Sequence, residues 1–168
     1  MSAPSLEYQH AKYINYGFLA AKAEKACHAL TQNRELTPEE FSVLQNGSEF
    51  LKQVATGAKA LDSGNYQVNN LKGAMDAFEF VIDPLEQLSE FFNNTDIADA
   101  LNNAAETVIT LGLHPSQAIS DKQLKQIELF REFYEHFYTF IQFQMSQVKK
   151  DNPLGDKLRF QTEYAAYQ

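Results

Sequence analysis

Apolar side chains recur at three- and four-residue steps along almost the whole chain, and this period constrains the fold more than any other feature. The spacing matches the 3.6-residue turn of an α-helix, so it collects the apolar side chains on one face. Alternation at two-residue steps, which is typical of strands, is nearly absent. The sequence therefore predicts an all-α fold.

Five helices follow from this period and from the turn residues between the periodic segments. Turn residues such as Gly64 and Pro115 fall between those segments, which indicates short connections between antiparallel helices. The predicted helices cover residues 5–32, 38–61, 66–92, 95–112 and 120–150, and residues 152–168 are predicted to form a partly ordered tail or a short helix. A chain of 168 residues favours one domain. We therefore expect a single helical bundle over residues 1–168.

The second predicted helix has the clearest start signal. Thr37 can cap the helix, Pro38 suits its first turn, and Glu40 completes a capping box. Within this helix, Gly47 and Gly57 are expected to weaken the helical conformation, with a break possible at Gly47. The same kind of signal predicts caps at Thr95 for the fourth helix and at Ser120 or Asp121 for the fifth.

The third predicted helix contains a proline in its interior. Pro84 lacks a backbone N–H and its ring clashes with the preceding turn, so the helix is expected to kink or split there. Asp83 is a candidate cap for the second piece.

The fifth predicted helix is long and rich in aromatic residues. Its apolar stripe is widened by Phe133 and Phe140, and Tyr138 and Phe143 lie further round the helix. One interpretation is that this is a central helix buried on several faces. The other is that part of the stripe meets a partner, since Phe and Tyr are enriched at the buried centre of interfaces. Phe133, Tyr138, Phe140 and Phe143 are the candidate contact residues.

The charge of the chain bears on its partners. The formal net charge is −8, and the three arginines are Arg34, Arg131 and Arg159. Affinity for nucleic acid comes from basic side chains, so direct binding of nucleic acid is not expected. An acidic chain can instead imitate nucleic acid and inhibit a protein that binds it. Such a mimic needs clustered carboxylates, and the third predicted helix has five at helical spacing, which a solvated face would also explain. These residues are Asp76, Glu79, Asp83, Glu86 and Glu90.

Several classes of site have no support in the sequence. Cys27 is the only cysteine, so no intramolecular disulfide is possible and a reducing compartment is expected. We expect Cys27 to be buried and inert. No secretory signal and no membrane-spanning segment is predicted, which favours a cytoplasmic protein without a membrane partner. The histidines do not fall at metal-binding spacings, so neither a metal nor a cofactor is expected.

One local motif contains residue types that can act in catalysis. Residues 131–138 contain Arg131, His136 and Tyr138 in the order Arg-x4-His-x-Tyr. The motif resembles that of the HEPN family, small all-helical domains that often act as metal-independent ribonucleases in toxin and defence systems. The resemblance implies that Arg131 stabilises phosphate charge, that His136 serves as acid or base, and that Tyr138 supports the site at a dimer cleft. The alternative is that Arg131 forms an ion pair with Glu135, one turn further along the helix.

The leading functional hypothesis is a non-enzymatic, acidic helical protein that binds another protein or itself. Catalytic motifs other than the Arg-x4-His-x-Tyr match are absent, and the first and fifth predicted helices are longer than most globular helices. A HEPN-like ribonuclease and an acidic inhibitor that imitates nucleic acid are the alternatives.

Overall fold

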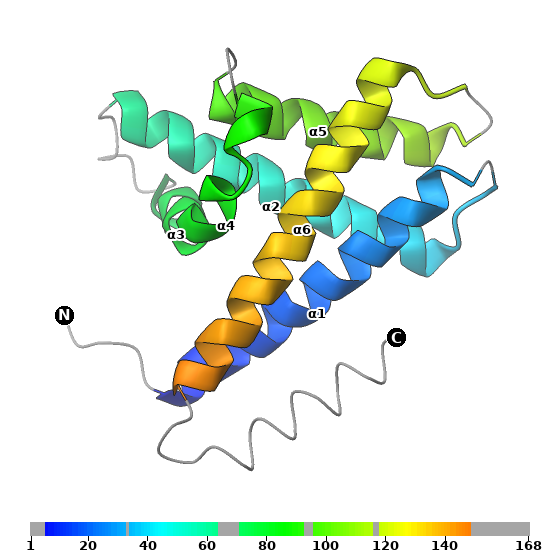
Figure 1. The fold of residues 1–168 in the computed structure, drawn as a ribbon. Helices are drawn as coiled ribbons and strands as arrows, with labels where there is room; N and C mark the ends of the chain where they lie inside the picture. Colours follow the sequence, from blue (N-terminus) through cyan, green and yellow to red (C-terminus); the bar gives the residue numbers. More distant parts are fainter. Residues whose placement is uncertain (1–5, 33, 64–70, 93–95, 116–117, 149–168) are drawn as a thin grey trace.

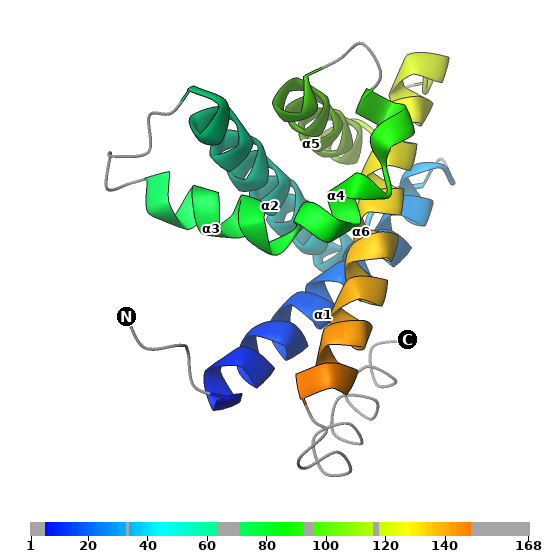
Figure 2. The ribbon, with the colours of Figure 1, turned by 60° about the vertical axis from the view of Figure 1, so that its left-hand side comes forward.

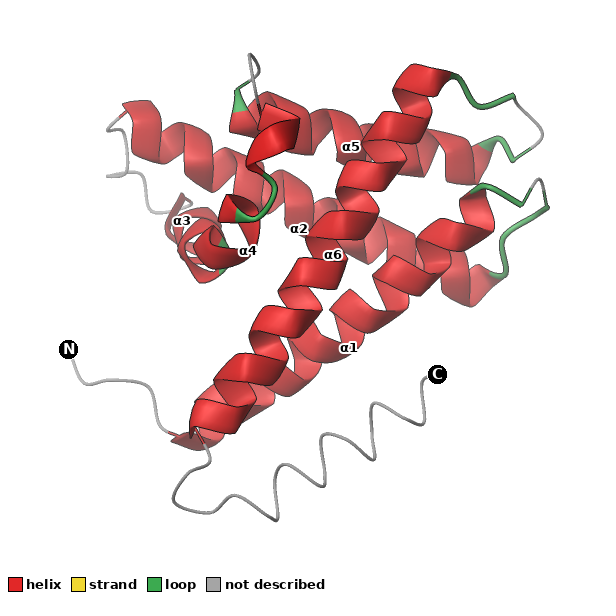
Figure 3. Ribbon diagram, viewed as in Figure 1, coloured by secondary structure: helices red, strands yellow, loops and turns green. Residues whose placement is uncertain are grey.

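The computed structural model describes residues 6–32, 34–63, 71–92, 96–115 and 118–148, and this part of the chain consists of helices and loops without strands (Figure 3). The prediction of an all-α fold is thus confirmed. The predicted tail, residues 152–168, lies outside the described residues. The helices are α1 (Leu6–Leu30), α2 (Pro38–Ser63), α3 (Lys72–Phe80), α4 (Ile82–Glu86), the 3-10 helix η2 (Ser89–Phe92), α5 (Ile97–Leu113) and α6 (Asp121–Val148).

Helices α1 and α6 form a long antiparallel pair. Near the C-terminal end of α1, the Glu24 carboxylate lies 4.0 Å from the Arg131 guanidinium. Further toward the N-terminus of α1, the ring centroids of Tyr16 and Phe137 are 5.7 Å apart. Residue numbers thus rise along α1 as they fall along α6. The N-terminal half of α1 and the C-terminal half of α6 project together beyond α2 and α5 (Figures 1 and 2).

Helix α2 contacts α1, α3 and α5 and runs unbroken through both of its glycines. At Gly57, a Cβ atom would lie 2.1 Å from the carbonyl oxygen of Ala74, so α3 can approach α2 this closely only because the side chain is missing. At Gly47, a Cβ atom would lie 3.1 Å from the Phe130 ring. The possible break at Gly47 is not present in the structure. The missing side chain instead makes room for residues of α6.

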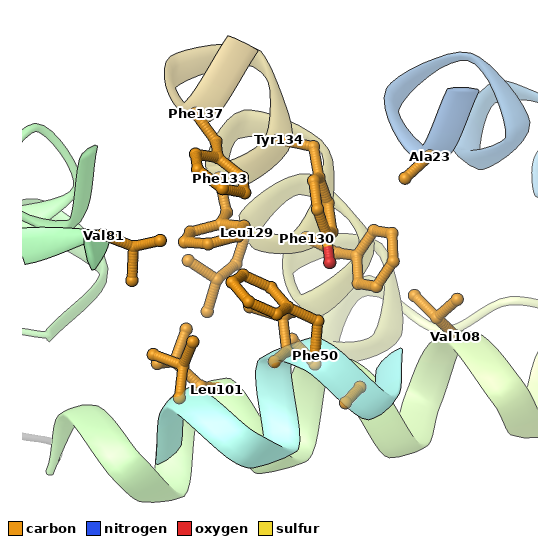
Figure 4. Close-up of a cluster of buried hydrophobic side chains, with 14 of the residues drawn as sticks. Ala23, Phe50, Val81, Leu101, Val108, Leu129, Phe130, Phe133, Tyr134 and Phe137 are labelled. Atoms are coloured by element: carbon orange, nitrogen blue, oxygen red, sulfur yellow. The ribbon is translucent and has the colours of Figure 1, made fainter. Parts of the chain in front are cut away.

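The core is dominated by aromatic side chains of α6. Phe130, Phe133, Tyr134 and Phe137 are fully buried and face residues of α2 and α5 (Figure 4). The Phe137 ring stacks on Phe50 at a centroid distance of 5.6 Å and an interplanar angle of 1°. These four residues therefore bear out the interpretation of a central, buried helix.

A buried hydroxyl group connects this aromatic stripe to α2. The Tyr134 hydroxyl donates a hydrogen bond of 2.6 Å to the carbonyl oxygen of Gly47. Tyrosine hydroxyls need a partner when they are buried, and here the close approach at Gly47 supplies one.

The predicted caps of α2 and α6 agree with the structure, and that of α5 is displaced by one residue. The Thr37 N–H donates to the Glu40 carboxylate at 2.8 Å, and the Glu40 N–H donates to the Thr37 hydroxyl at 3.1 Å, which confirms the capping box. Ser120 and Gln123 make the same reciprocal pair at the start of α6. The cap of α5 is Asp96 and not the predicted Thr95, and its side chain accepts from the Ala98 N–H at 2.7 Å.

The region of the third predicted helix differs from the expectation. Residues 64–70 lie outside the described residues, and the rest is divided into α3, α4 and η2. The chain breaks at Val81, and Pro84 lies in the first turn of α4. A continuous helix would place the Pro84 ring against the carbonyl of Phe80, four residues before it. The break therefore falls one turn before the proline.

Candidate interaction surface on helices α1 and α6

The last twelve residues of α6 carry no charged side chain. From Phe137 to Val148 there is no Asp, Glu, Lys or Arg, although the whole chain has 22 acidic and 14 basic residues. Phe143 in this segment is 58% exposed, and it is the one aromatic residue among the large exposed hydrophobic residues of the described chain. The polar residues exposed beside it are also uncharged, namely Thr139, Gln142, Ser146 and Gln147.

A segment of α1 beside the start of this run, between Lys12 and Lys22, has the same character. Residues 13–21 contain no Asp, Glu, Lys or Arg. Asn15 is exposed and Phe18 is half-buried in this segment. We call residues 13–21 of α1 together with residues 137–148 of α6 the uncharged end. At its inner boundary it packs on α2, where Tyr16 and Phe137 both contact Phe50.

The four predicted contact residues have different environments. Phe143 is exposed. Phe140 is half-buried and makes an edge contact with Phe80 of α3 at a centroid distance of 6.0 Å. Tyr138 is also half-buried, and its hydroxyl accepts a hydrogen bond of 2.8 Å from the Gln142 side chain.

Phe133 requires a correction. Its side chain is 0% exposed, so it packs inside this chain and cannot meet a partner. The helical period alone placed it at the edge of the stripe, and the packing of several helices around α6 buries that edge as well.

The Arg131 guanidinium lies among three carboxylates. Its nitrogens are 3.2 Å from Glu135, 3.8 Å from Glu132 and 4.0 Å from Glu24 of α1. The ion pair with Glu135 confirms the alternative interpretation of this arginine. Its positive charge is thus matched within the chain, whereas an arginine that stabilises phosphate must offer its charge to the substrate.

His136, the second residue of the motif, is half-buried on α6. It stands five residues after Arg131, so the two side chains leave a straight helix in directions about 140° apart. The local geometry of α6 alone therefore does not join them into one site.

The carboxylates predicted to form one acidic stripe are all exposed, but they lie on three different helices. Asp76 and Glu79 belong to α3, Asp83 and Glu86 to α4, and Glu90 to η2. The break at Val81 divides the stripe that a continuous helix would have presented.

The remaining candidate residues are structural. Cys27 is fully buried, as predicted, and burial raises the pKa of its thiol. Within the described residues, no group of three or more His, Cys, Asp or Glu side chains could hold a metal ion. None of the described helices combines the length and the apolar character that a membrane crossing requires.

The uncharged end was missed by the sequence analysis, although its signal is present in the sequence. A run of twelve residues without charge inside a chain of net charge −8 is visible without a structure. What the structure adds is that one aromatic residue of this run is exposed.

Comparison with protein-family models, with curated proteins and with solved structures finds no match to this chain.

Proposed function

We propose that the protein is a non-enzymatic interaction protein that binds another protein, or a second copy of itself, through the uncharged end. The observation that carries this proposal is the exposed Phe143 on a helical segment without charged residues. Interface centres are depleted in charged residues and enriched in aromatic ones, so this segment has the composition of such a centre.

The absence of charge matters because association removes surface from water. Burying an unpaired charge is costly, whereas amide and hydroxyl groups can exchange water for hydrogen bonds across an interface. Gln142, Ser146 and Gln147 provide such groups around Phe143. The uncharged end can therefore be covered at a lower free-energy cost than the charged faces of the molecule.

The two alternative functions have weaker support. A HEPN-like ribonuclease would need the Arg131 charge that Glu24, Glu132 and Glu135 already neutralise. An acidic mimic of nucleic acid would need a continuous array of carboxylates, and the break at Val81 divides the one predicted here.

The test is size-exclusion chromatography with light scattering on wild type and two variants. Phe143→Glu places a charge at the centre of the proposed interface. Leu113→Glu is the matched control, because Leu113 is also 58% exposed but lies at the end of α5. We expect wild type to self-associate, and Phe143→Glu to weaken the dimer by about 30-fold or more, corresponding to about 2 kcal/mol. Leu113→Glu should behave as wild type.

If wild type is monomeric, the same three proteins are compared in a quantitative pull-down. A partner retained by wild type and Leu113→Glu but lost by Phe143→Glu supports the proposal. Equal behaviour of the two variants in both assays contradicts it.

A further inference from the structure

A groove lies between η2, α5 and the N-terminal half of α6, away from the uncharged end. Its volume is about 550 Å³, within the range of sites that hold small molecules. Its lining includes two buried apolar residues, Ala100 of α5 and Leu129 of α6, and the half-buried Phe91 of η2. A ligand in the groove would therefore contact apolar surface as well as polar side chains.

One end of the groove is positive. Lys122 and Lys125 line it from the first two turns of α6, where the helix dipole adds positive potential. Both lysines are exposed, and neither forms an ion pair with the residues that the structure describes.

The other end is negative. Glu128 of α6 and Glu90 of η2 also line the groove, and neither has an ion-pair partner in the described part of the chain. Lys122 and Glu128 are six residues apart on α6, which corresponds to about 9 Å along the helix axis. Lys122 and Glu128 are thus separated along α6, while Lys125 lies between them, three residues before Glu128.

The pKa of the neighbouring Glu132 reflects the negative charge at this end of the groove. Its pKa is raised, first by burial and then by repulsion from Glu128 and Glu90, while Arg131 acts in the opposite direction. Glu128 and Glu90 are therefore close enough to Glu132 to disfavour its charged form, which a bound cation would relieve.

We propose that this groove binds a small zwitterionic molecule. Its acidic group would pair with Lys122 and Lys125, its ammonium group would pair with Glu90 and Glu128, and an apolar linker would cover Leu129. This inference does not depend on the proposed function, because the groove and the uncharged end share no residue.

The experiment is an NMR titration of the protein with 6-aminohexanoate, whose two charged groups are separated by an apolar chain. Hexanoate and hexylamine are titrated in parallel, since each keeps one charged group. We expect amide shifts around Phe91, Asn103 and residues 122–129. Each single-ended probe should bind about two- to fivefold more weakly, because ion pairs to exposed side chains are weak in water.

Variants assign the two ends. The double variant Lys122→Gln/Lys125→Gln should lower the affinity for 6-aminohexanoate and hexanoate but not for hexylamine. Glu90→Gln/Glu128→Gln should lower the affinity for 6-aminohexanoate and hexylamine but not for hexanoate. Lys72→Gln on α3, which removes another exposed lysine, is the control. Equal affinities for the three probes, amide shifts outside the groove or the absence of shifts would each overturn the proposal.

Discussion

Two glycines of α2 allow another helix to approach closely because they have no side chain. Gly47 leaves room for the Phe130 ring and offers its carbonyl to the Tyr134 hydroxyl. Gly57 leaves room for the backbone of α3 at Ala74. In both cases the glycine sets how closely a second helix can approach, although glycine lowers the intrinsic stability of the helix that contains it.

Gly57→Ala tests this role. Helix propensity alone predicts that alanine stabilises α2 by about 1 kcal/mol. The new Cβ would lie 2.1 Å from the Ala74 carbonyl oxygen, however, so α3 would have to move. We expect the free energy of unfolding to fall by about 2 kcal/mol, as in other overpacked cores. Urea unfolding followed by circular dichroism measures the change.

Gly73→Ala is the matched control for this variant. Gly73 is exposed on α3, and a Cβ atom there would lie 3.3 Å from the end of the flexible Gln53 side chain. This substitution should leave stability unchanged or raise it by up to about 1 kcal/mol. A Gly57→Ala protein as stable as Gly73→Ala would mean that the close approach of α2 and α3 does not constrain the fold.

The sequence shows these glycines only as weak points of a helix. Their partners, Ala74 and Tyr134, are distant in the chain, and no local pattern reveals them. The same reason explains the error at Phe133. Its place in the helical period was read correctly, but its burial depends on residues from other helices, including Phe50 of α2.

At the scale of elements, the sequence was sufficient to predict a helix start where that start depends on contacts between residues close in the chain. The capping boxes at Thr37 and Ser120 involve contacts only three residues apart, so the starts of α2 and α6 could be predicted. The division of residues 71–92 was only partly predictable. Pro84 predicts an interruption of the helix, but the position of the break at Val81 depends on how α3 and α4 pack.

The cap of α2 makes stability depend on pH. The Glu40 carboxylate accepts hydrogen bonds from the Arg34 guanidinium at 2.9 and 2.8 Å. These bonds, followed by the Thr37 backbone N–H, lower the pKa of Glu40 from 4.5 to about 2. Because the folded-state pKa is depressed, the stabilisation is fully present above the unfolded value and is lost as pH falls through the folded value.

Glu40→Gln tests this dependence. The difference in free energy of unfolding between wild type and Glu40→Gln should be constant above about pH 5.5 and should shrink as the pH falls from 4.5 toward 2. Chemical unfolding at a series of pH values measures it. Glu49→Gln, which removes an exposed carboxylate from the same helix, controls for the loss of one negative charge. A Glu40→Gln difference that does not change over this range would contradict the assigned role.

For the whole molecule, the folded state depends on one hydrophobic cluster to which all six α-helices contribute. Phe137 of α6 packs against aromatic side chains from three other helices. Its ring contacts Tyr16 of α1, Phe50 of α2 and Phe80 of α3. Six residues further along α6, Phe143 is exposed. The same helix thus passes from the centre of the core to the proposed interface within two turns.

Phe137→Ala and Phe143→Ala separate these two roles. Removing a buried phenylalanine ring costs about 3–5 kcal/mol, a large part of the 5–15 kcal/mol that holds a typical domain folded. We expect Phe137→Ala to lower the free energy of unfolding by that amount. Phe143→Ala should change it by no more than about 0.5 kcal/mol in dilute, monomeric protein. Urea unfolding at low protein concentration gives both values. A loss of more than about 2 kcal/mol in Phe143→Ala would place this side chain in the core and remove the main support for an interface at the uncharged end.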